Sequence, residues 1–244
     1  MRALELPAHL FPADVAARAV RVDLATDAVI ATVAELDGIP LPASLAGAVP
    51  KRRLEYLAGR YCARAALRDC AHALAEEPLG QGPNREPLWP AGAAGSIAHT
   101  TGVVVAAASG SGLVGAVGVD VERWMNDDAP RRIGAHITTD GELPELCERT
   151  GWSSGRALTL VFSAKETLYK CLYPEVRRYF GFQDARVVSI DAERGAFEIA
   201  LTVALEHLPA GLTLAGRFEP LDDVVLTSLV RDSRGSARGR PASG

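Results

Sequence analysis

The sequence predicts an α+β fold in which two similar halves meet near residue 118. The first observation is the order of the predicted elements: strand, helix, strands in residues 1–117, then helix, strands in residues 118–231. The second is that each half has one long segment with helical periodicity, whereas its other apolar segments are short and rich in β-branched residues. No internal repeat of the sequence accompanies this order. Residues 232–244, rich in Ser, Arg and Gly, are expected to form a disordered tail.

In the first half, strands are predicted within residues 18–34 and a long helix over residues 50–75. A loop rich in Gly and Pro follows, and then strands at 96–99, 102–109 and 113–122.

The helix over 50–75 carries a row of arginines, because Arg53, Arg60 and Arg64 fall in one narrow sector at 100° per residue. The solvated face of an amphipathic helix explains such a row. A phosphate-binding surface explains it as well, since guanidinium groups match phosphate geometry.

In the second half, residues 125–154 are polar and irregular, with room for short helices. A second long helix is predicted over 155–172, ending before Pro174 because proline cannot donate a backbone hydrogen bond. Four further strands complete the half, at residues 185–190, 196–203, 212–219 and 223–231.

Composition excludes several classes of protein. A chain of 244 residues that is 48% hydrophobic can bury a substantial core. Its net charge of −4 argues against a general nucleic-acid-binding protein. No signal peptide and no membrane span of about 20 apolar residues is present, so we expect a cytoplasmic protein without a membrane partner. No pair of cysteines has the Cys-x-x-Cys spacing, which indicates reduced thiols at Cys62, Cys70, Cys147 and Cys171.

Two carboxylates interrupt the buried strand "AVGVDVERW". Asp120 and Glu122 are two positions apart and share one face, whereas Val117, Val119 and Val121 share the other. Like charges separated by about 7 Å repel each other, so the pair needs a partner. With Glu166 of the second helix there are three carboxylates, and such a set suits a hard divalent cation.

Cationic residues accompany these carboxylates, and together they suit a ligand with several phosphates. A metal held by few carboxylates and by substrate phosphates is typical of magnesium, and the chemistry indicated is attack on a phosphorus centre. Simpler explanations exist: Glu166 and Lys170 form an i, i+4 surface pair, Lys165 extends to the rim of its apolar stripe, and His99 is structural. The cations are Arg52, Arg53, Arg60, His99, Lys165 and Lys170.

The motifs resemble those of a known family. "GVDVE", followed some forty residues later by "FSAKETLYK", resembles the signature of Sfp-type 4′-phosphopantetheinyl transferases. "KRRLEYLAGRYCARAAL", "REPLWPAGAAGSIAHT" and "RRYFGFQDARV" are similar to the subgroup of enterobactin-synthetase component D and actinobacterial enzymes. The resemblance covers about residues 48–190. It implies the 4′-phosphopantetheinyl transferase fold, in which two α+β halves with pseudo-two-fold symmetry enclose the active site.

The resemblance implies a holo-[carrier protein] synthase. Such an enzyme moves the 4′-phosphopantetheine arm of coenzyme A to a serine of an apo acyl or peptidyl carrier protein and releases adenosine 3′,5′-bisphosphate. It also implies Mg²⁺ or Mn²⁺ at Asp120, Glu122 and Glu166, with Glu166 at the position of the general base. The catalytic residues implied are Glu166, Asp120 and Lys170. We expect a monomer, because the two halves already form one site.

The same resemblance places the coenzyme in the first half, residues 1–117, and the metal and catalytic helix in the second, residues 118–231. Lys165 and Lys170 match positions that neutralise its phosphates. The loop 81–86, which contains Arg85, matches one that lies along the adenine. The residues that match positions binding the 3′-phosphate and adenosine end of coenzyme A are Arg52, Arg53, Arg60 and His99. One departure is Ala98, where many members have a serine.

Two other functions use the same residues: a metal-dependent pyrophosphatase that hydrolyses coenzyme A, and a non-catalytic regulator that binds it. The intact carboxylates argue against the regulator.

A docking surface for an acidic carrier protein is predicted at "EVRRYFGF", where Arg177 and Arg178 precede Tyr179, Phe180 and Phe182. The alternative is that these aromatic residues cover the end of the core.

Overall fold

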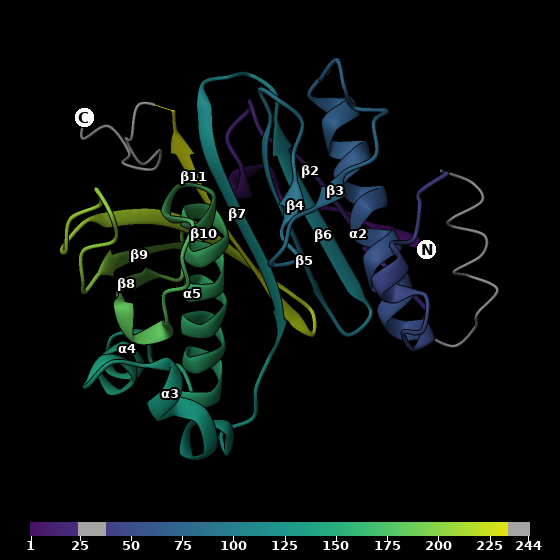
Figure 1. Ribbon diagram of the computed structural model, residues 1–244. Helices are drawn as coiled ribbons and strands as arrows, with labels where there is room; N and C mark the ends of the chain where they lie inside the picture. Colours follow the sequence, from purple (N-terminus) through teal and green to yellow (C-terminus); the bar gives the residue numbers. More distant parts are fainter. Residues whose placement is uncertain (24–37, 234–244) are drawn as a thin grey trace.

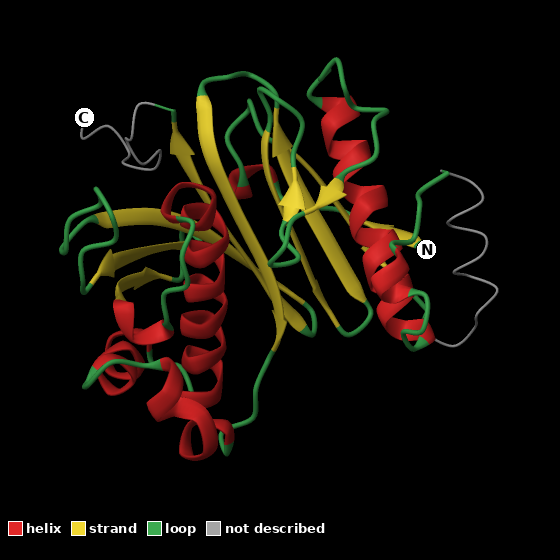
Figure 2. Ribbon diagram, viewed as in Figure 1, coloured by secondary structure: helices red, strands yellow, loops and turns green. Residues whose placement is uncertain are grey.

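The computed structural model describes residues 1–23 and 38–233. It is a mixed α+β fold with two antiparallel sheets, and one long helix packs on each sheet (Figures 1 and 2). The predicted fold class is therefore confirmed. No helix in the described residues is long and apolar enough to cross a membrane.

The first sheet has the strand order β1-β2-β6-β5, and helix α2 lies against it. Its elements are β1 (Arg2–Leu4), β2 (Ala16–Arg21), α2 (Pro50–Asp69), β5 (Ala94–Thr100) and β6 (Val103–Ser109). Strands β3 (Gly80–Gln81) and β4 (Pro87–Leu88) pair with each other as a separate two-stranded hairpin. The short helical turns η1 (Ala8–Leu10) and η2 (Ala43–Leu45) complete this half.

The second sheet has the order β7-β11-β10-β9-β8, and helix α5 packs against it. Its elements are β7 (Val114–Arg123), α5 (Ser154–Val176), β8 (Ala185–Asp191), β9 (Ala196–Leu201), β10 (Thr213–Leu221) and β11 (Val224–Asp232). The polar segment before α5 contains the predicted short helices, η3 (Pro130–Gly134), α3 (Ala135–Ile137) and α4 (Glu142–Thr150), and η4 (Phe182–Asp184) precedes β8.

The two sheets meet where β5 lies beside β7 (Figure 1). The Val119 N–H donates to the Ser96 hydroxyl at 3.1 Å across this junction. Ala98 of β5 and Val119 and Val121 of β7 share one buried apolar cluster. This continuous core holds the two halves together, because separating the sheets would expose it to water.

A glycine in each half lets its helix come close to a strand. A Cβ at Gly59 of α2 would lie 2.9 Å from the Ile97 side chain. A Cβ at Gly118 of β7 would lie 2.1 Å from the Thr167 carbonyl oxygen of α5. Because Gly118, Asp120 and Glu122 share one face of β7, this close approach brings the carboxylates against α5.

The first long helix is shorter than predicted. It ends at Asp69, because Ala71 adopts the left-handed conformation with φ of +53°. The N–H groups of Ala71 and His72 then donate to the carbonyls of Arg68 and Leu67, which is a Schellman cap. Alanine at this position, where glycine is usual, gives the sequence no stop signal.

The second long helix is longer than predicted, because it continues through Pro174 to Val176. Proline removes one backbone hydrogen bond, to the carbonyl of Lys170, and does so in the last turn, where little helix remains to be disrupted. Arg177, with φ of +54°, then ends the helix, and its N–H donates to the Tyr173 carbonyl at 2.9 Å.

Three predictions concern the ends and the boundary of the halves. The strand predicted within residues 28–34 lies outside the described residues. The predicted tail, residues 232–244, lies outside them beyond Ser233, and its first residue, Asp232, is instead the last residue of β11. The chain changes sheet in the turn 110–113. The division into domains after residue 117 stays a prediction.

An ion-pair cluster joins the halves at one end of this junction. Asp223, in the β10–β11 turn, accepts from Arg21 of β2 at 2.8 Å and lies 2.6 Å from Arg123 of β7. Arg123 also donates to the Thr101 carbonyl in the β5–β6 turn at 2.9 Å. The Arg21 hydrogen bond lowers the pKa of Asp223 below its ordinary value.

We expect Asp223→Asn to reduce the free energy of unfolding at pH 7 by about 1 kcal/mol or less, because the group is partly exposed. A lowered native pKa stabilises the fold above the unfolded pKa of about 3.9, and this contribution disappears as the pH falls through the native value. The difference between the variant and the natural protein should therefore narrow below about pH 4. Denaturant unfolding at several pH values measures it, and a constant difference would contradict the assignment.

Candidate active site

Asp120 is the most enclosed of the three predicted carboxylates, with 3% of its surface exposed. From β7 it points at α5, where Lys170 donates to Oδ1 at 2.6 Å and Ser163 donates to Oδ2 at 2.8 Å. Thr227 of β11, opposite Asp120 in the sheet, lies 2.8 Å from the Ser163 hydroxyl. Both oxygens of Asp120 are thus held in a fixed orientation.

Glu122 and Glu166 extend this carboxylate group. Burial raises the pKa of Glu122 to about 7, and the charges of Asp120 and Glu166 add to the rise while Lys170 opposes it. Burial also raises the pKa of Glu166, with Lys170 again opposing. Glu122 and Glu166 are therefore both affected by the charge of Asp120, while the metal-binding role of the three carboxylates stays a prediction.

The donor set matches a hard divalent cation in chemistry: three carboxylates, partly or wholly buried, of which two have raised pKa values. A cation there would offset both the burial and the mutual repulsion that raise those pKa values. In residues 1–23 and 38–233, however, no three His, Cys, Asp or Glu side chains are already gathered as a metal-binding group. Asp120 is instead engaged by Lys170, so binding a cation requires the side chains to rearrange.

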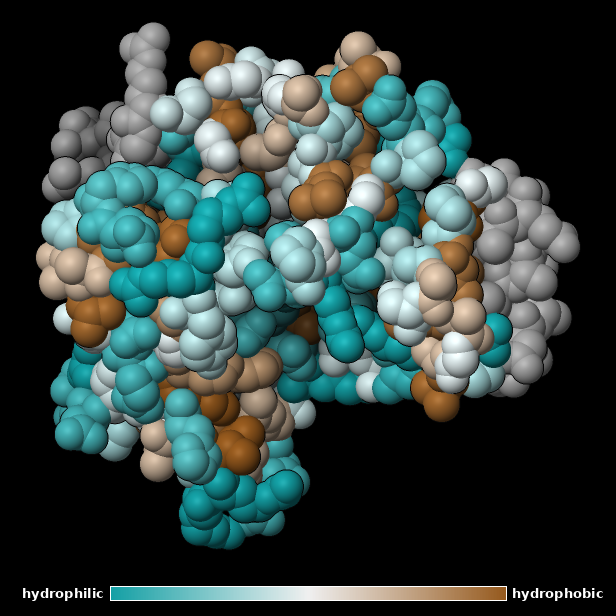
Figure 3. Space-filling view, in the orientation of Figure 1, coloured by the Kyte–Doolittle hydropathy of each residue, from teal (hydrophilic) through white to brown (hydrophobic). Residues whose placement is uncertain are grey.

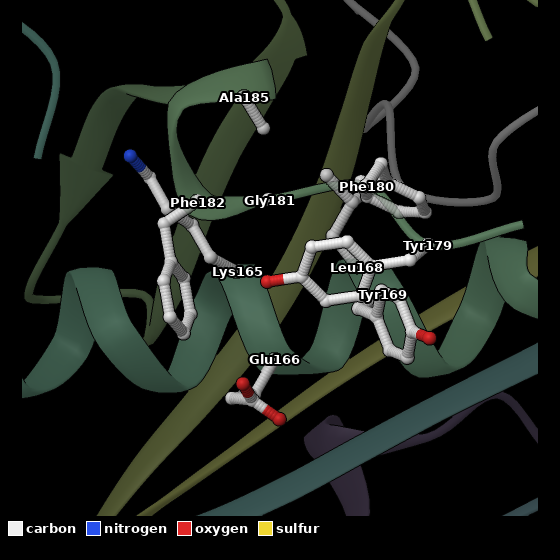
Figure 4. Close-up of a pocket in the computed structure, with 9 residues that line it drawn as sticks. All are labelled: Lys165, Glu166, Leu168, Tyr169, Tyr179, Phe180, Gly181, Phe182 and Ala185. Carbon is white, nitrogen blue, oxygen red and sulfur yellow. The ribbon is translucent and has the colours of Figure 1, made fainter. Parts of the chain in front are cut away.

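The structure does not support the phosphate-binding role implied for Lys165. Its amine donates to Glu142 and to the Ile137 carbonyl, both at 2.8 Å, and its side chain is 2% exposed. Burial lowers the pKa of Lys165, and Glu142 opposes this. Consecutive helical residues point about 100° apart, and Lys165 and Glu166 leave α5 in different directions (Figure 4). Lys165 meets an anion, but the anion is Glu142 of the protein itself.

The first half contributes Arg52 and His99. The Arg52 guanidinium donates to His99 Nε2 at 2.8 Å. Burial lowers the pKa of His99; the charges of Glu55 and Asp120 raise it, and those of Arg52 and Lys170 lower it. The charges of Asp120 and Lys170 therefore act on His99 from across the junction. In Figure 3 the surface is hollowed between the two halves, with hydrophilic side chains around the hollow.

The other predicted cations have surroundings of their own. Arg60 is 8% exposed, stacks over the Tyr56 ring at 4.6 Å, and lines a separate cavity of about 270 Å³ with Arg64. Arg53 is half-buried, and within the described chain its Nε has no hydrogen-bond partner. Arg85 is exposed in the turn of the β3–β4 hairpin, where its φ is +67°.

An apolar cavity of about 140 Å³ lies beside Glu166. Tyr169 on α5 and Tyr179, Phe180 and Phe182 after the helix form much of its wall (Figure 4). The β3–β4 hairpin of the first half reaches this region, where Asn84 donates to the Tyr173 hydroxyl at 2.6 Å. The site is therefore built from both halves.

Four residues of this region have no counterpart in the sequence-based prediction: Ser163, Thr227, Glu142 and Glu55. Ser163 lies within the quoted helix motif, four residues before Thr167, on the face that meets β7 and β11. Glu55 was detectable as the one acid among the cations that open the helix. Thr227 and Glu142 come from distant segments, and only the fold brings them here.

Comparison with known proteins agrees with this architecture. A family model described as "4′-phosphopantetheinyl transferase N-terminal domain" matches residues 41–109. A second, described as "4′-phosphopantetheinyl transferase superfamily", matches residues 116–225. The two ranges fall on the two halves.

Curated relatives match over both halves. The 4′-phosphopantetheinyl transferase Npt of Nocardia iowensis is 30% identical over 76% of this chain and 85% of its own length. The 4′-phosphopantetheinyl transferase PptT of Mycobacterium tuberculosis is 32% identical over 78% of this chain and 86% of its own. Enterobactin synthase component D of Salmonella austin is 35% identical over 68% of this chain and 64% of its own.

The two sheets, each with its helix, form an α+β fold with acidic and basic groups at their junction, and the family models that match both halves describe an enzyme of the transferase class. With these relatives, the chain belongs to the 4′-phosphopantetheinyl transferase family, of the type that includes enterobactin synthase component D.

Proposed function

We propose that this enzyme transfers the 4′-phosphopantetheine arm of coenzyme A to a serine of an apo acyl or peptidyl carrier protein, with Mg²⁺ as cofactor and adenosine 3′,5′-bisphosphate as the second product. The observation that carries the proposal is the group of Asp120, Glu122, Glu166 and Lys170 at the junction, where the charges of Asp120 and Lys170 also act on His99 of the other half. A monomer contains the whole of this site.

In the proposed reaction, the serine oxygen forms a bond to the phosphorus next to the pantetheine. The bond from this phosphorus to the bridging oxygen of the pyrophosphate breaks, and its electron pair leaves with adenosine 3′,5′-bisphosphate. Glu166 takes the serine proton. Lys170 binds the pyrophosphate oxygens, and Asp120 orients Lys170 through their 2.6 Å contact.

The metal would be held by Asp120, Glu122 and Glu166. A divalent cation bound there supplies stabilisation of negative charge on the phosphate oxygens. We assign the apolar cavity beside Glu166 to the pantetheine arm, because its aromatic wall suits a largely uncharged chain. Arg52 and the arginines of α2 are assigned to the phosphates at the adenosine end, with Arg85 beside the adenine.

The test is incubation with coenzyme A, Mg²⁺ and a panel of apo carrier proteins, followed by mass spectrometry of each carrier. Transfer adds the mass of one 4′-phosphopantetheine group to the carrier and releases adenosine 3′,5′-bisphosphate in equal amount. Release of the nucleotide without a modified carrier would instead identify a coenzyme A pyrophosphatase. Binding of coenzyme A with neither product would identify a regulator.

A carrier-docking surface is proposed at residues 177–182. Tyr179 is 75% exposed and suits an anchor, whereas Phe180 is 5% exposed and belongs to the core. Arg178 is exposed and pairs with Glu206 at 3.0 Å. The structural explanation thus accounts for Phe180, and the docking explanation rests on Tyr179 and the two arginines.

We expect the double change Arg177→Glu with Arg178→Glu to raise KM for the carrier, most strongly at low salt, because it reverses the charge that attracts an acidic partner. The affinity for coenzyme A should be unchanged. Arg194→Glu, a charge reversal at an exposed arginine in the β8–β9 turn, is the control. An equal loss for both substrates, or a lower melting temperature, favours a structural role.

A further inference from the structure

Helix α2 begins with an unusual arrangement of charge. Its first turn carries Lys51, Arg52 and Arg53 and no acidic residue. A helix N-terminus already has a partial positive charge, so cations there repel it and one another. Glu55, one turn into the helix, is 6% exposed and lies among these cations.

Three cationic or titratable groups surround the Glu55 carboxylate. Oε2 lies 3.7 Å from the Arg52 guanidinium and 3.6 Å from His99 Nδ1, and Oε1 lies 3.8 Å from the Lys51 amine. Lys51 also donates to the Thr101 hydroxyl at 3.1 Å. Glu55 is therefore the common counter-ion of a basic surface formed by α2 and the end of β5.

The same geometry fixes the proton on His99. Arginine has only donors, so the His99 Nε2 that lies 2.8 Å from Arg52 must accept and carries no proton. The ring proton of neutral His99 is then on Nδ1, which faces Glu55 at 3.6 Å. A carboxylate at that position favours this tautomer.

We propose that Glu55 is a positioning residue, an internal counter-ion that holds Arg52 and His99 in the orientation required by a phosphate group of coenzyme A without touching the coenzyme itself. The inference rests on the proposed function, since it takes coenzyme A as the ligand. It assigns to Glu55 an effect on ligand affinity that passes entirely through its two neighbours.

The sign of the effect separates this role from simple electrostatics. A carboxylate near a phosphate site repels the ligand, so neutralising it should strengthen binding if charge alone mattered. If Glu55 orients Arg52 and His99, neutralising it should weaken binding. The two explanations therefore predict opposite changes in the dissociation constant.

The experiment measures coenzyme A binding by calorimetry to the full-length natural protein, Glu55→Gln, Glu55→Asp and Asp69→Asn. Asp69 ends the same helix, where it pairs with Arg18 at 2.6 Å, so its change removes an equal charge away from the site. We expect Glu55→Gln to weaken binding by roughly tenfold, a loss comparable with that of an outer-shell partner at a metal site. Glu55→Asp should recover part of it, and Asp69→Asn should bind normally.

A second measurement does not depend on the ligand, and its first part needs no variant. Nitrogen chemical shifts of His99 in the natural protein should show a proton on Nδ1 and none on Nε2. In Glu55→Gln the pKa of His99 should fall further, because Glu55 is the largest influence that raises it, while Asp120 also raises it and Arg52 and Lys170 lower it.

The outcomes are distinct. If the natural protein binds no coenzyme A, the proposed function fails, and the tautomer measurement still tests the role of Glu55. If it binds and Glu55→Gln binds equally or more tightly, the positioning role is overturned. A proton on Nε2 overturns it as well, including in the case where Glu55→Gln does not fold.

Discussion

Asp120→Asn should abolish transfer, with a fall in kcat of about 10³-fold or more, the upper range for loss of a group that stabilises charge in the transition state. The change keeps the shape of the side chain, and the amide oxygen still accepts from Ser163. It removes the negative charge that the metal needs and that fixes Lys170 at 2.6 Å.

The measurement is carrier modification at a series of Mg²⁺ concentrations. If Asp120 binds the metal, half-saturation should move to higher Mg²⁺ in the variant. If Asp120 acts only by orienting Lys170, then Lys170→Gln should reproduce its loss and the metal dependence should not change. Asp191→Asn, an exposed change on β8, is the control for a lost charge. Turnover near that of the natural protein would exclude Asp120 from both roles.

Glu166→Gln should lower kcat by at least about 10²-fold, the effect typical of a lost general base. The variant keeps the length of the side chain and its place on α5 but can neither accept the serine proton nor supply a charged ligand. The folded state should be retained, because removing a buried charge with a raised pKa relieves rather than adds desolvation.

Two measurements divide the roles of Glu166. A fall in kcat with the Mg²⁺ half-saturation unchanged indicates a base alone, and a change in both indicates a base that is also a ligand. Glu198→Gln on β9, which removes a carboxylate bonded to Ser189, is the matched control. Turnover unchanged by Glu166→Gln across the pH range would rule out both roles.

Local pattern was sufficient for most of the secondary structure. Short apolar segments located β5, β6 and β7, and the two long helices followed from their helical periodicity. Strands β1, β3 and β4 were not predicted, and two further errors fall at helix ends, at Ala71 and Pro174, where backbone conformation decides the boundary. Both are positions whose residue type gives the wrong signal: alanine where a cap forms, and proline where the helix continues.

Within the site, the sequence predicted which residues share a face but not which partners they meet. The alternation of β7 correctly placed Asp120 and Glu122 opposite the valines. Lys165 shows the limit, because its place in the apolar stripe left open whether its amine extends to the rim or meets an anion, and did not reveal Glu142 as its partner. A helical position fixes the direction of a side chain, whereas its partner comes from a segment that is distant along the chain.

The sequence by itself determined the family, the α+β class and the carboxylates, because motif spacing and side-chain periodicity are local properties of the chain. Only the tertiary structure decided that Lys170 and Ser163 hold Asp120, that Lys165 is buried against Glu142, and that Glu55 lies between Arg52 and His99. These pairings depend on the packing of two sheets and two helices. Burial then sets the strength of each charge interaction, since a carboxylate removed from water interacts more strongly with whatever group the fold places beside it.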